Sequence, residues 1–143
     1  MAYDSPVFTE IIQPMRDELT AIGFSEVHTP EAVDEVLTNH QGTMMFVVNS
    51  ICGCAAGIAR PAIAEALTVA PAPDHLYTVF AGQDVDATAQ ARTYFTNFPP
   101  SSPSIAFFKD GQFVTLIERH QIEKHKKADV TSLIVQELNR LNA

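Results

Sequence analysis

The chain is poor in cysteine, in basic residues and in long hydrophobic segments, and each shortage excludes a class of protein. It has only two cysteines among 143 residues, too few for a secreted scaffold held together by disulfides. Nine Lys and Arg against seventeen Asp and Glu leave a formal net charge of −8, which would repel the phosphates of nucleic acid. No apolar run approaches the ~20 residues that cross a bilayer. We therefore expect neither nucleic acid nor a membrane among the partners.

The rest of the composition is typical of a globular protein. Apolar residues make up 46% and charged residues 18% of the chain, and this length suffices for one hydrophobic core. The stretch Met1–Asp4 has neither the basic nor the apolar segment of a secretory signal. We therefore expect a single domain over residues 1–143, located in the cytoplasm. In that compartment a close cysteine pair is more typical of catalysis or metal binding than of a structural disulfide.

Both cysteines stand where a strand gives way to a helix. The apolar run Met44–Val48, typical of a strand buried on both faces, leads directly to Cys52-Gly53-Cys54. A helix is expected over 54–70, bent at Pro61 because proline lacks the N–H of a helix interior. The unpaired N–H groups and partial positive charge at a helix start lower the pKa of a thiol. The pattern predicts a thiol–disulfide redox site with Cys52 as nucleophile and Cys54 as its redox partner.

The remaining patterns predict a mixed sheet covered by helices. Middle strand–helix–strand units imply right-handed parallel crossovers, and Asp110-Gly111 indicates a terminal β-hairpin. The result is an α/β, thioredoxin-like fold: a central mixed sheet with helices on both faces and an additional N-terminal helix. The expected helices are 6–22 (kinked or divided at Pro14), 30–40, 54–70, 84–95 and 128–141, and the expected strands are 24–28, 43–49, 76–81, 104–108 and 112–117.

The spacing of the cysteines restricts their chemistry. With one intervening residue, an intramolecular disulfide closes a small and strained ring, which disfavours a strong reductant. The spacing suits isomerisation, oxidation, or a cycle in which Cys52 carries a small thiol. Gly53 is expected to allow the unusual backbone angles of such a ring. Because no charged residue lies between 46 and 59, activation of Cys52 is expected from local N–H donors, with Ser50 donating a hydrogen bond to the thiolate.

A second predicted part of the site is the loop that ends at Ser102-Pro103. A proline directly before a strand, in a loop that faces the cysteines, is a candidate for a cis peptide bond. A cis bond would expose the N–H and C=O groups of Ser102 to an extended substrate. Asn49 and Gln83 could orient the surrounding loops, or could simply satisfy local backbone groups.

Other interpretations stay open. The cysteines could be buried structural thiols or could bind a metal. Zinc requires three or four protein ligands, and none of the histidines (His28, His40, His75, His120, His125) shows ligand spacing near the cysteines. The basic cluster Arg119, His120, Lys124, His125, Lys126 and Lys127 could attract the carboxylates of a low-molecular-weight thiol or could be a solvated surface. A non-catalytic metal- or partner-binding module on the same fold is a further alternative.

The stretch Asn49-Ser50-Ile51-Cys52-Gly53-Cys54-Ala55-Ala56-Gly57-Ile58-Ala59-Arg60-Pro61 resembles the signature of the bacilliredoxins, thioredoxin-like bacterial proteins with a Cys-Gly-Cys site. The resemblance extends through 14–16, 80–84, 100–104 and 119–125 and covers essentially the whole chain. It implies removal of bacillithiol from S-bacillithiolated client proteins, with bacillithiol as thiol co-substrate and no resident cofactor or metal. The attacking cysteine carries over to Cys52, the second cysteine to Cys54 and the cis-proline to Pro103. A general disulfide isomerase or oxidant is the enzymatic alternative, since weak isomerase activity is also attributed to the family.

Overall fold

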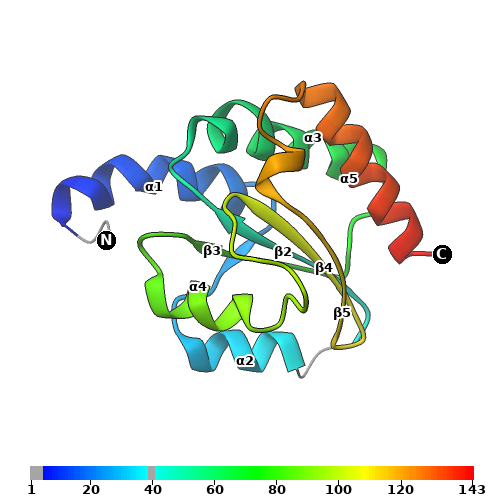
Figure 1. Ribbon diagram of the computed structural model, residues 1–143, viewed down its shortest axis with the longest axis horizontal. Helices are drawn as coiled ribbons and strands as arrows, with labels where there is room; N and C mark the ends of the chain where they lie inside the picture. Colours follow the sequence, from blue (N-terminus) through cyan, green and yellow to red (C-terminus); the bar gives the residue numbers. More distant parts are fainter. Residues whose placement is uncertain (1–4, 39–40) are drawn as a thin grey trace.

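The computed structural model describes residues 5–38 and 41–143, in which one mixed five-stranded sheet lies between two layers of helices (Figure 1). Met1–Asp4, from which we argued against a signal, and His40 lie outside the described residues. The elements follow the predicted order: α1 (Pro6–Thr20), β1 (Ser25–Glu26), α2 (Pro30–Thr38), β2 (Thr43–Asn49), a π-helix η1 (Ala55–Ala59), α3 (Arg60–Val69), β3 (His75–Phe80), α4 (Val85–Arg92), β4 (Ser104–Lys109), β5 (Gln112–Ile117), a short 3₁₀ helix η2 (Arg119–Gln121) and α5 (Lys127–Leu141).

The sheet has the strand order β1-β3-β2-β4-β5, so β2 lies at its centre. β2 runs parallel to β3, where Asn49 pairs with Phe80, and antiparallel to β4, where Val48 pairs with Ser104. The carboxyl end of β2 therefore lies beside the amino end of β4. This register brings the turn after β2 next to the proline-containing loop before β4, as the functional interpretation of both segments requires.

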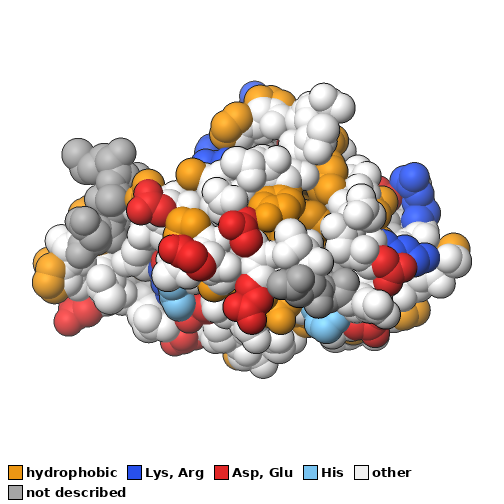
Figure 2. Space-filling view, turned by 90° about the horizontal axis from the view of Figure 1, so that it is seen from below, with side chains coloured by type: hydrophobic (Ala, Val, Ile, Leu, Met, Phe, Trp, Pro, Cys, Tyr) orange, Lys and Arg blue, Asp and Glu red, His pale blue; other side chains and the backbone are white. Residues whose placement is uncertain are grey.

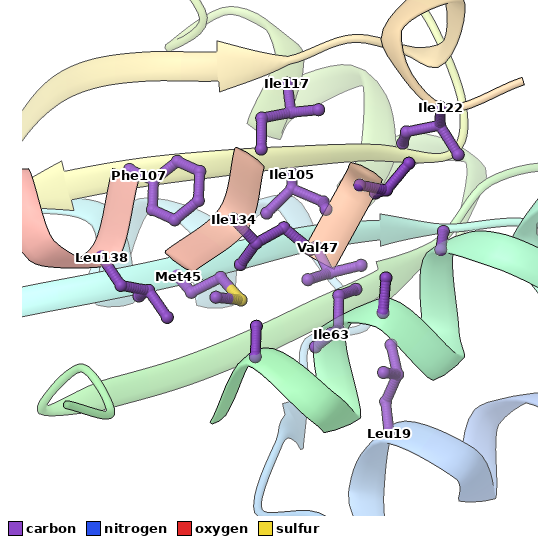
Figure 3. Close-up of a cluster of buried hydrophobic side chains, with 14 of the residues drawn as sticks. Leu19, Met45, Val47, Ile63, Ile105, Phe107, Ile117, Ile122, Ile134 and Leu138 are labelled. Atoms are coloured by element: carbon purple, nitrogen blue, oxygen red, sulfur yellow. The ribbon is translucent and has the colours of Figure 1, made fainter. Parts of the chain in front are cut away.

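A hydrophobic core lies on each face of the sheet, because successive side chains of a strand point to opposite faces. On one face Met45, Val47 and Phe107 pack against α1, α3 and α5 (Figure 3). On the other face Met44, Phe46, Val48 and Phe108 pack against α2 and α4. Every residue of β2 is buried, which explains its unbroken apolar sequence.

The first helix departs from the prediction at its proline. α1 begins after Ser5, whose hydroxyl accepts a hydrogen bond from the N–H of Phe8 at 3.4 Å. It then continues through Pro14 as one helix to Thr20, so, of the two expected effects of Pro14, division is wrong, while a kink stays a prediction. Gly23, at φ 108°, ends the segment in a conformation that favours glycine.

The predicted helix 54–70 is two elements. Its first turn, η1, is a π-helix in which the N–H of Arg60 bonds to the carbonyl of Ala55, and α3 follows with Pro61 in its first turn. A proline inside an α-helix removes one hydrogen bond and clashes with the carbonyl four residues earlier, whereas a first-turn proline costs neither. The wider π turn thus places Pro61 where the helix tolerates it, and the prediction of one bent helix is corrected.

Acidic side chains are spread over the face of the molecule formed by α2 and α4 (Figure 2), in keeping with the negative net charge.

Within residues 5–38 and 41–143, no helix is both long and apolar enough to cross a membrane.

Candidate functional site

The cysteine turn places two free thiols side by side. The sulfurs of Cys52 and Cys54 lie 2.6 Å apart, and the backbone N–H of Cys54 points to the Cys52 sulfur at 3.3 Å. Both side chains are half-buried. A thiol donor and a backbone donor therefore converge on the sulfur of Cys52, as expected for a stabilised thiolate.

The pKa of Cys52 lies below that of an ordinary cysteine. Partial burial raises this pKa, but hydrogen bonds from the Cys54 thiol and from backbone N–H groups of Cys54 and Ala55 lower it. The positive charge of Arg119 lowers it further. The net direction is downward, so Cys52 is the thiol more readily ionised and the one suited to attack.

Cys54 has the opposite character. Burial, together with its hydrogen bond to Cys52 and the negative charge of the Cys52 thiolate, raises its pKa to about 11. At neutral pH Cys54 therefore keeps its proton and donates it in the hydrogen bond to Cys52. The two neighbouring thiols therefore differ in pKa in opposite directions.

One predicted role at this turn is corrected. The Ser50 hydroxyl accepts a hydrogen bond from the N–H of Cys52 at 3.0 Å, and among the described residues it makes none to the Cys52 sulfur. Ser50 thus shapes the turn and does not bond to the thiolate. Gly53 is not among the glycines with positive φ in this form with free thiols, and its role in closing a Cys52–Cys54 ring stays a prediction. Apart from its chain neighbours, a Cβ at this position would meet nothing within 4 Å.

Asn49 bonds to backbone groups and to a side chain at the start of the turn, so its contacts fit both of its predicted roles. Its side-chain oxygen accepts hydrogen bonds from the N–H of Ser50 at 2.8 Å and from Nη1 of Arg60 at 3.0 Å, and its amide donates to the carbonyl of Met15 at 3.1 Å. Arg60 is only 3% exposed and also donates to the carbonyl of Ser50 at 3.0 Å. Arg60 is thus an internal support of the turn.

Loop 101–103 lies at the cysteine turn, and the Ser102–Pro103 peptide bond is cis as expected. The carbonyl of Ser102 is not free, however, because it accepts a hydrogen bond from Nη1 of Arg119 at 3.3 Å. The N–H of Arg119 also donates to the Ser101 hydroxyl at 3.4 Å. The Ser102 carbonyl has a second lone pair, so a substrate that pairs with it would share this acceptor with Arg119.

A cleft of about 510 Å³ opens beside Cys52, and Arg92, Ser102 and Arg119 are among the residues that line it. Arg92 comes from the end of α4 and was not foreseen, because no motif surrounds it in the sequence. A larger hollow of about 610 Å³ lies between Val69 and α5, but neither cysteine lines it. The cleft at Cys52 is therefore the binding space that matters for thiol chemistry.

Only Arg119 of the predicted basic cluster lines the cleft. His120 pairs with Glu118 and Lys127 pairs with Glu65, so these two act as surface partners. His120 and His125 line a separate hollow. In the part of the chain that the structure describes, no three His, Cys, Asp or Glu side chains are grouped so as to hold a metal ion.

Comparisons with known proteins support the redox interpretation of this geometry. A family model described as disulphide isomerase matches residues 8–141. A bacilliredoxin of Bacillus cereus is 52% identical over 121 residues, 85% of this chain and 83% of the relative. A bacilliredoxin of Geobacillus kaustophilus is 48% identical over 97% of this chain and 92% of the relative.

Solved structures confirm the thioredoxin-like fold. Oxidised mitochondrial thioredoxin 3 of Saccharomyces cerevisiae has a TM-score of 0.59 at 11% identity, over 87% of this chain and 99% of that one. The thioredoxin of Malassezia sympodialis has a TM-score of 0.58 at 15% identity, over 85% of this chain and 92% of that one. At such identities the likeness concerns the fold alone.

Proposed function

The chain belongs to the bacilliredoxin family, and from that premise we propose that it removes bacillithiol from S-bacillithiolated proteins, in the cytoplasm. It is a thiol–disulfide oxidoreductase with a thioredoxin-like fold. The observation that carries the proposal is the asymmetry of the two thiols at the cleft: the pKa of Cys52 is lowered and that of Cys54 is raised to about 11. Such an asymmetry assigns attack to Cys52 and leaves Cys54 protonated during it.

The first step is an exchange without net redox change. The Cys52 thiolate attacks the bacillithiol sulfur of the client–bacillithiol disulfide. A Cys52–bacillithiol disulfide forms, the original disulfide breaks, and the client cysteine leaves as a thiolate that takes up a proton. The half-buried sulfur of Cys52 at the cleft is open to a mixed disulfide on a client surface.

Release follows by one of two routes. In one route, the thiolate of a second bacillithiol attacks the bacillithiol sulfur of the mixed disulfide, which forms bacillithiol disulfide and frees Cys52 as a thiolate. In the other route, Cys54 loses its proton and attacks the Cys52 sulfur, which forms the Cys52–Cys54 disulfide and releases bacillithiol as a thiolate. The second route becomes easier after the first step. The Cys52 thiolate, whose hydrogen bond and charge raise the pKa of Cys54, no longer exists once Cys52 is in a disulfide. Bacillithiol is thus the co-substrate, and the proposal involves no resident cofactor.

The second candidate is a general disulfide isomerase or oxidant, which the description of the matching family model favours. Such an enzyme must accept extended polypeptide beside its cysteines. Here the Ser102 carbonyl, which would pair with such a chain, is bonded to Arg119. Because the carbonyl has a second lone pair, this bond does not exclude an extended chain, and the refolding assay described below decides between the two candidates.

The decisive experiment uses the Cys54→Ala variant and a protein carrying bacillithiol on one cysteine. The expected result is release of reduced client with stoichiometric bacillithiol trapped on Cys52, measured by intact-protein mass spectrometry. Cys52→Ala should show only the uncatalysed exchange. If Cys54→Ala leaves the client modified while Cys52 remains alkylatable, bacillithiol removal by Cys52 is wrong. The isomerase alternative is tested in parallel: the enzyme without substitutions is added to a protein with scrambled disulfides, and the rate at which that protein refolds is measured.

A further inference from the structure

The cleft beside Cys52 contains two guanidinium groups that the redox chemistry does not by itself require. Arg92 and Arg119 are the basic residues that line it, and none of its lining residues is acidic. Because the chain has a net charge of −8, its overall field repels anions, and a local pair of cations stands out against it. An anionic ligand is the chemistry that this wall fits.

Both arginines are held in place by consecutive carbonyls of loop 101–103. Nη2 of Arg92 donates to the carbonyl of Ser101 at 3.2 Å, and Nη1 of Arg119 donates to the carbonyl of Ser102 at 3.3 Å. One loop therefore fixes two guanidinium groups, from α4 and from η2, on the same wall of the cleft. Groups fixed before the ligand arrives lose little conformational freedom on binding.

Arg92 lacks the counter-charge that a buried cation normally has. It is half-buried, its Nε atom is buried without a hydrogen-bond partner, and none of the described carboxylates forms an ion pair with it. Burial lowers its pKa with no carboxylate to offset the effect. Arg119 does pair with Glu123, at 3.0 Å, but through Nε only. An anion that enters the cleft would supply the charge that Arg92 lacks.

We propose that Arg92 and Arg119 form an anion site that binds the carboxylate of a low-molecular-weight thiol while its sulfur reacts with Cys52. The proposal rests on the proposed function and adds how the enzyme selects one of the two sulfurs of the mixed disulfide. A mixed disulfide presents two sulfurs, and only attack on the small thiol's sulfur frees the client. A carboxylate held by these arginines, on the wall next to Cys52, turns the small thiol's sulfur toward the attacking thiolate. The arginines thus decide which sulfur is attacked.

The test compares three mixed disulfides of one client cysteine: with bacillithiol, with mercaptosuccinate, which carries two carboxylates, and with neutral 2-mercaptoethanol. Single-turnover rates are measured for Cys54→Ala alone and with Arg92→Gln, Arg92→Lys or Lys126→Gln added. Arg92→Gln should slow transfer of the anionic thiols about tenfold, the loss expected for one charge-assisted hydrogen bond. The 2-mercaptoethanol rate should change less than about twofold, Arg92→Lys should restore most of the loss, and Lys126→Gln controls for net charge.

Mass spectrometry of the adducts gives a second measure that a purely structural role would not move. With Arg92→Gln, a larger share of Cys52 should be joined to the client and a smaller share to the anionic thiol. Equal slowing of all three disulfides, or no slowing of the anionic two, would overturn the anion site. If Cys54→Ala itself fails with bacillithiol, the proposed function falls, and the mercaptosuccinate and 2-mercaptoethanol pair still decides the anion site.

Discussion

Two groups of arginines lie on either side of segment 81–84, and they differ in how the positive charge of each arginine is neutralised. Arg16 is 7% exposed and bonds to Glu26, Asp84 and Gln83. Arg92 and Arg119 line the cleft beside Cys52 together with Ala81 and Gly82. Segment 81–84 separates the groups, since its first two residues face the cleft and its last two bind Arg16.

The difference shows which charges hold the fold and which are available to a ligand. The Arg16 guanidinium has two carboxylates, and its charge centre lies 5.3 Å from the ring of Phe80. Asp84 also accepts the N–H of Phe80 at 2.9 Å and so ties α1 to the end of β3. Among the described residues, Arg92 has one hydrogen-bond partner, a backbone carbonyl. Removing a buried cation from its carboxylates leaves an unpaired buried charge and is strongly destabilising, whereas removing a cation without a carboxylate partner leaves none.

The largest predicted effect is on the neutralised group. Arg16→Met should lower the free energy of unfolding by about 3–5 kcal/mol, because it leaves the buried carboxylate of Asp84 without its cation. Urea denaturation followed by circular dichroism measures the change. The control is Arg140→Met, which removes a pair with Glu137 at an arginine that is 68% exposed, and which should cost less than about 1 kcal/mol. Equal effects for the two variants would contradict the structural role of Arg16.

A smaller effect is predicted for the exposed member of the cleft pair. Arg119→Gln removes a positive charge that lowers the pKa of Cys52, so that pKa should rise. At pH values below this pKa, a smaller fraction of Cys52 is thiolate in the variant. Alkylation of Cys52 should therefore slow about two- to fivefold, the effect of one exposed charge. Well above both pKa values the rates should converge.

The measurement for Arg119 is the rate of Cys52 alkylation against pH in a Cys54→Ser background, which removes the coupled thiol. Lys126→Gln is the matched loss of an exposed charge outside the cleft and should leave the profile in place. An unchanged midpoint in Arg119→Gln would mean that hydrogen-bond donors at the turn, without Arg119, set the pKa of Cys52.

The smallest predicted effect concerns the stability contribution of Arg92. Arg92→Gln should change the free energy of unfolding by less than about 1 kcal/mol, because loss of its bond to Ser101 is offset by removal of a half-buried charge without a carboxylate. Urea denaturation beside Arg16→Met measures it. A loss as large as that of Arg16→Met would remove the contrast between the two groups and make Arg92 a structural residue.

Local features of the sequence predicted most of the fold and the centre of the site. The apolar run before the cysteines became β2 over the predicted residues Thr43–Asn49. The Asp110-Gly111 turn, with both residues at positive φ, joins β4 and β5 as expected. The strand and the turn depend on neighbouring residues, through side-chain alternation and the backbone preferences of glycine. The cis bond at Pro103 is a candidate from its position before a strand, and the family resemblance implies it.

The errors occurred where distant contacts or helix geometry override local patterns. Ser50 is predicted to donate to the Cys52 thiolate, but its hydroxyl instead accepts the N–H of Cys52. Pro61 was expected to bend a helix, but a π turn precedes it. A pattern of residue types indicates which positions have a structural or functional role. It does not show which partner each of these residues contacts.

The sequence by itself determined the strand, the cysteine turn, their redox character and the family, because these depend on residues next to one another. Only the tertiary structure placed Arg92 and Arg119 around one cleft with Cys52. Forty and sixty-seven positions separate these arginines from the cysteine along the chain, and the pairing of β2 with β4 brings loop 101–103, which holds both, to the cysteine turn. Whether two distant residues meet depends on strand order and register. The residues on either side of a single arginine do not show which distant segment will lie beside it.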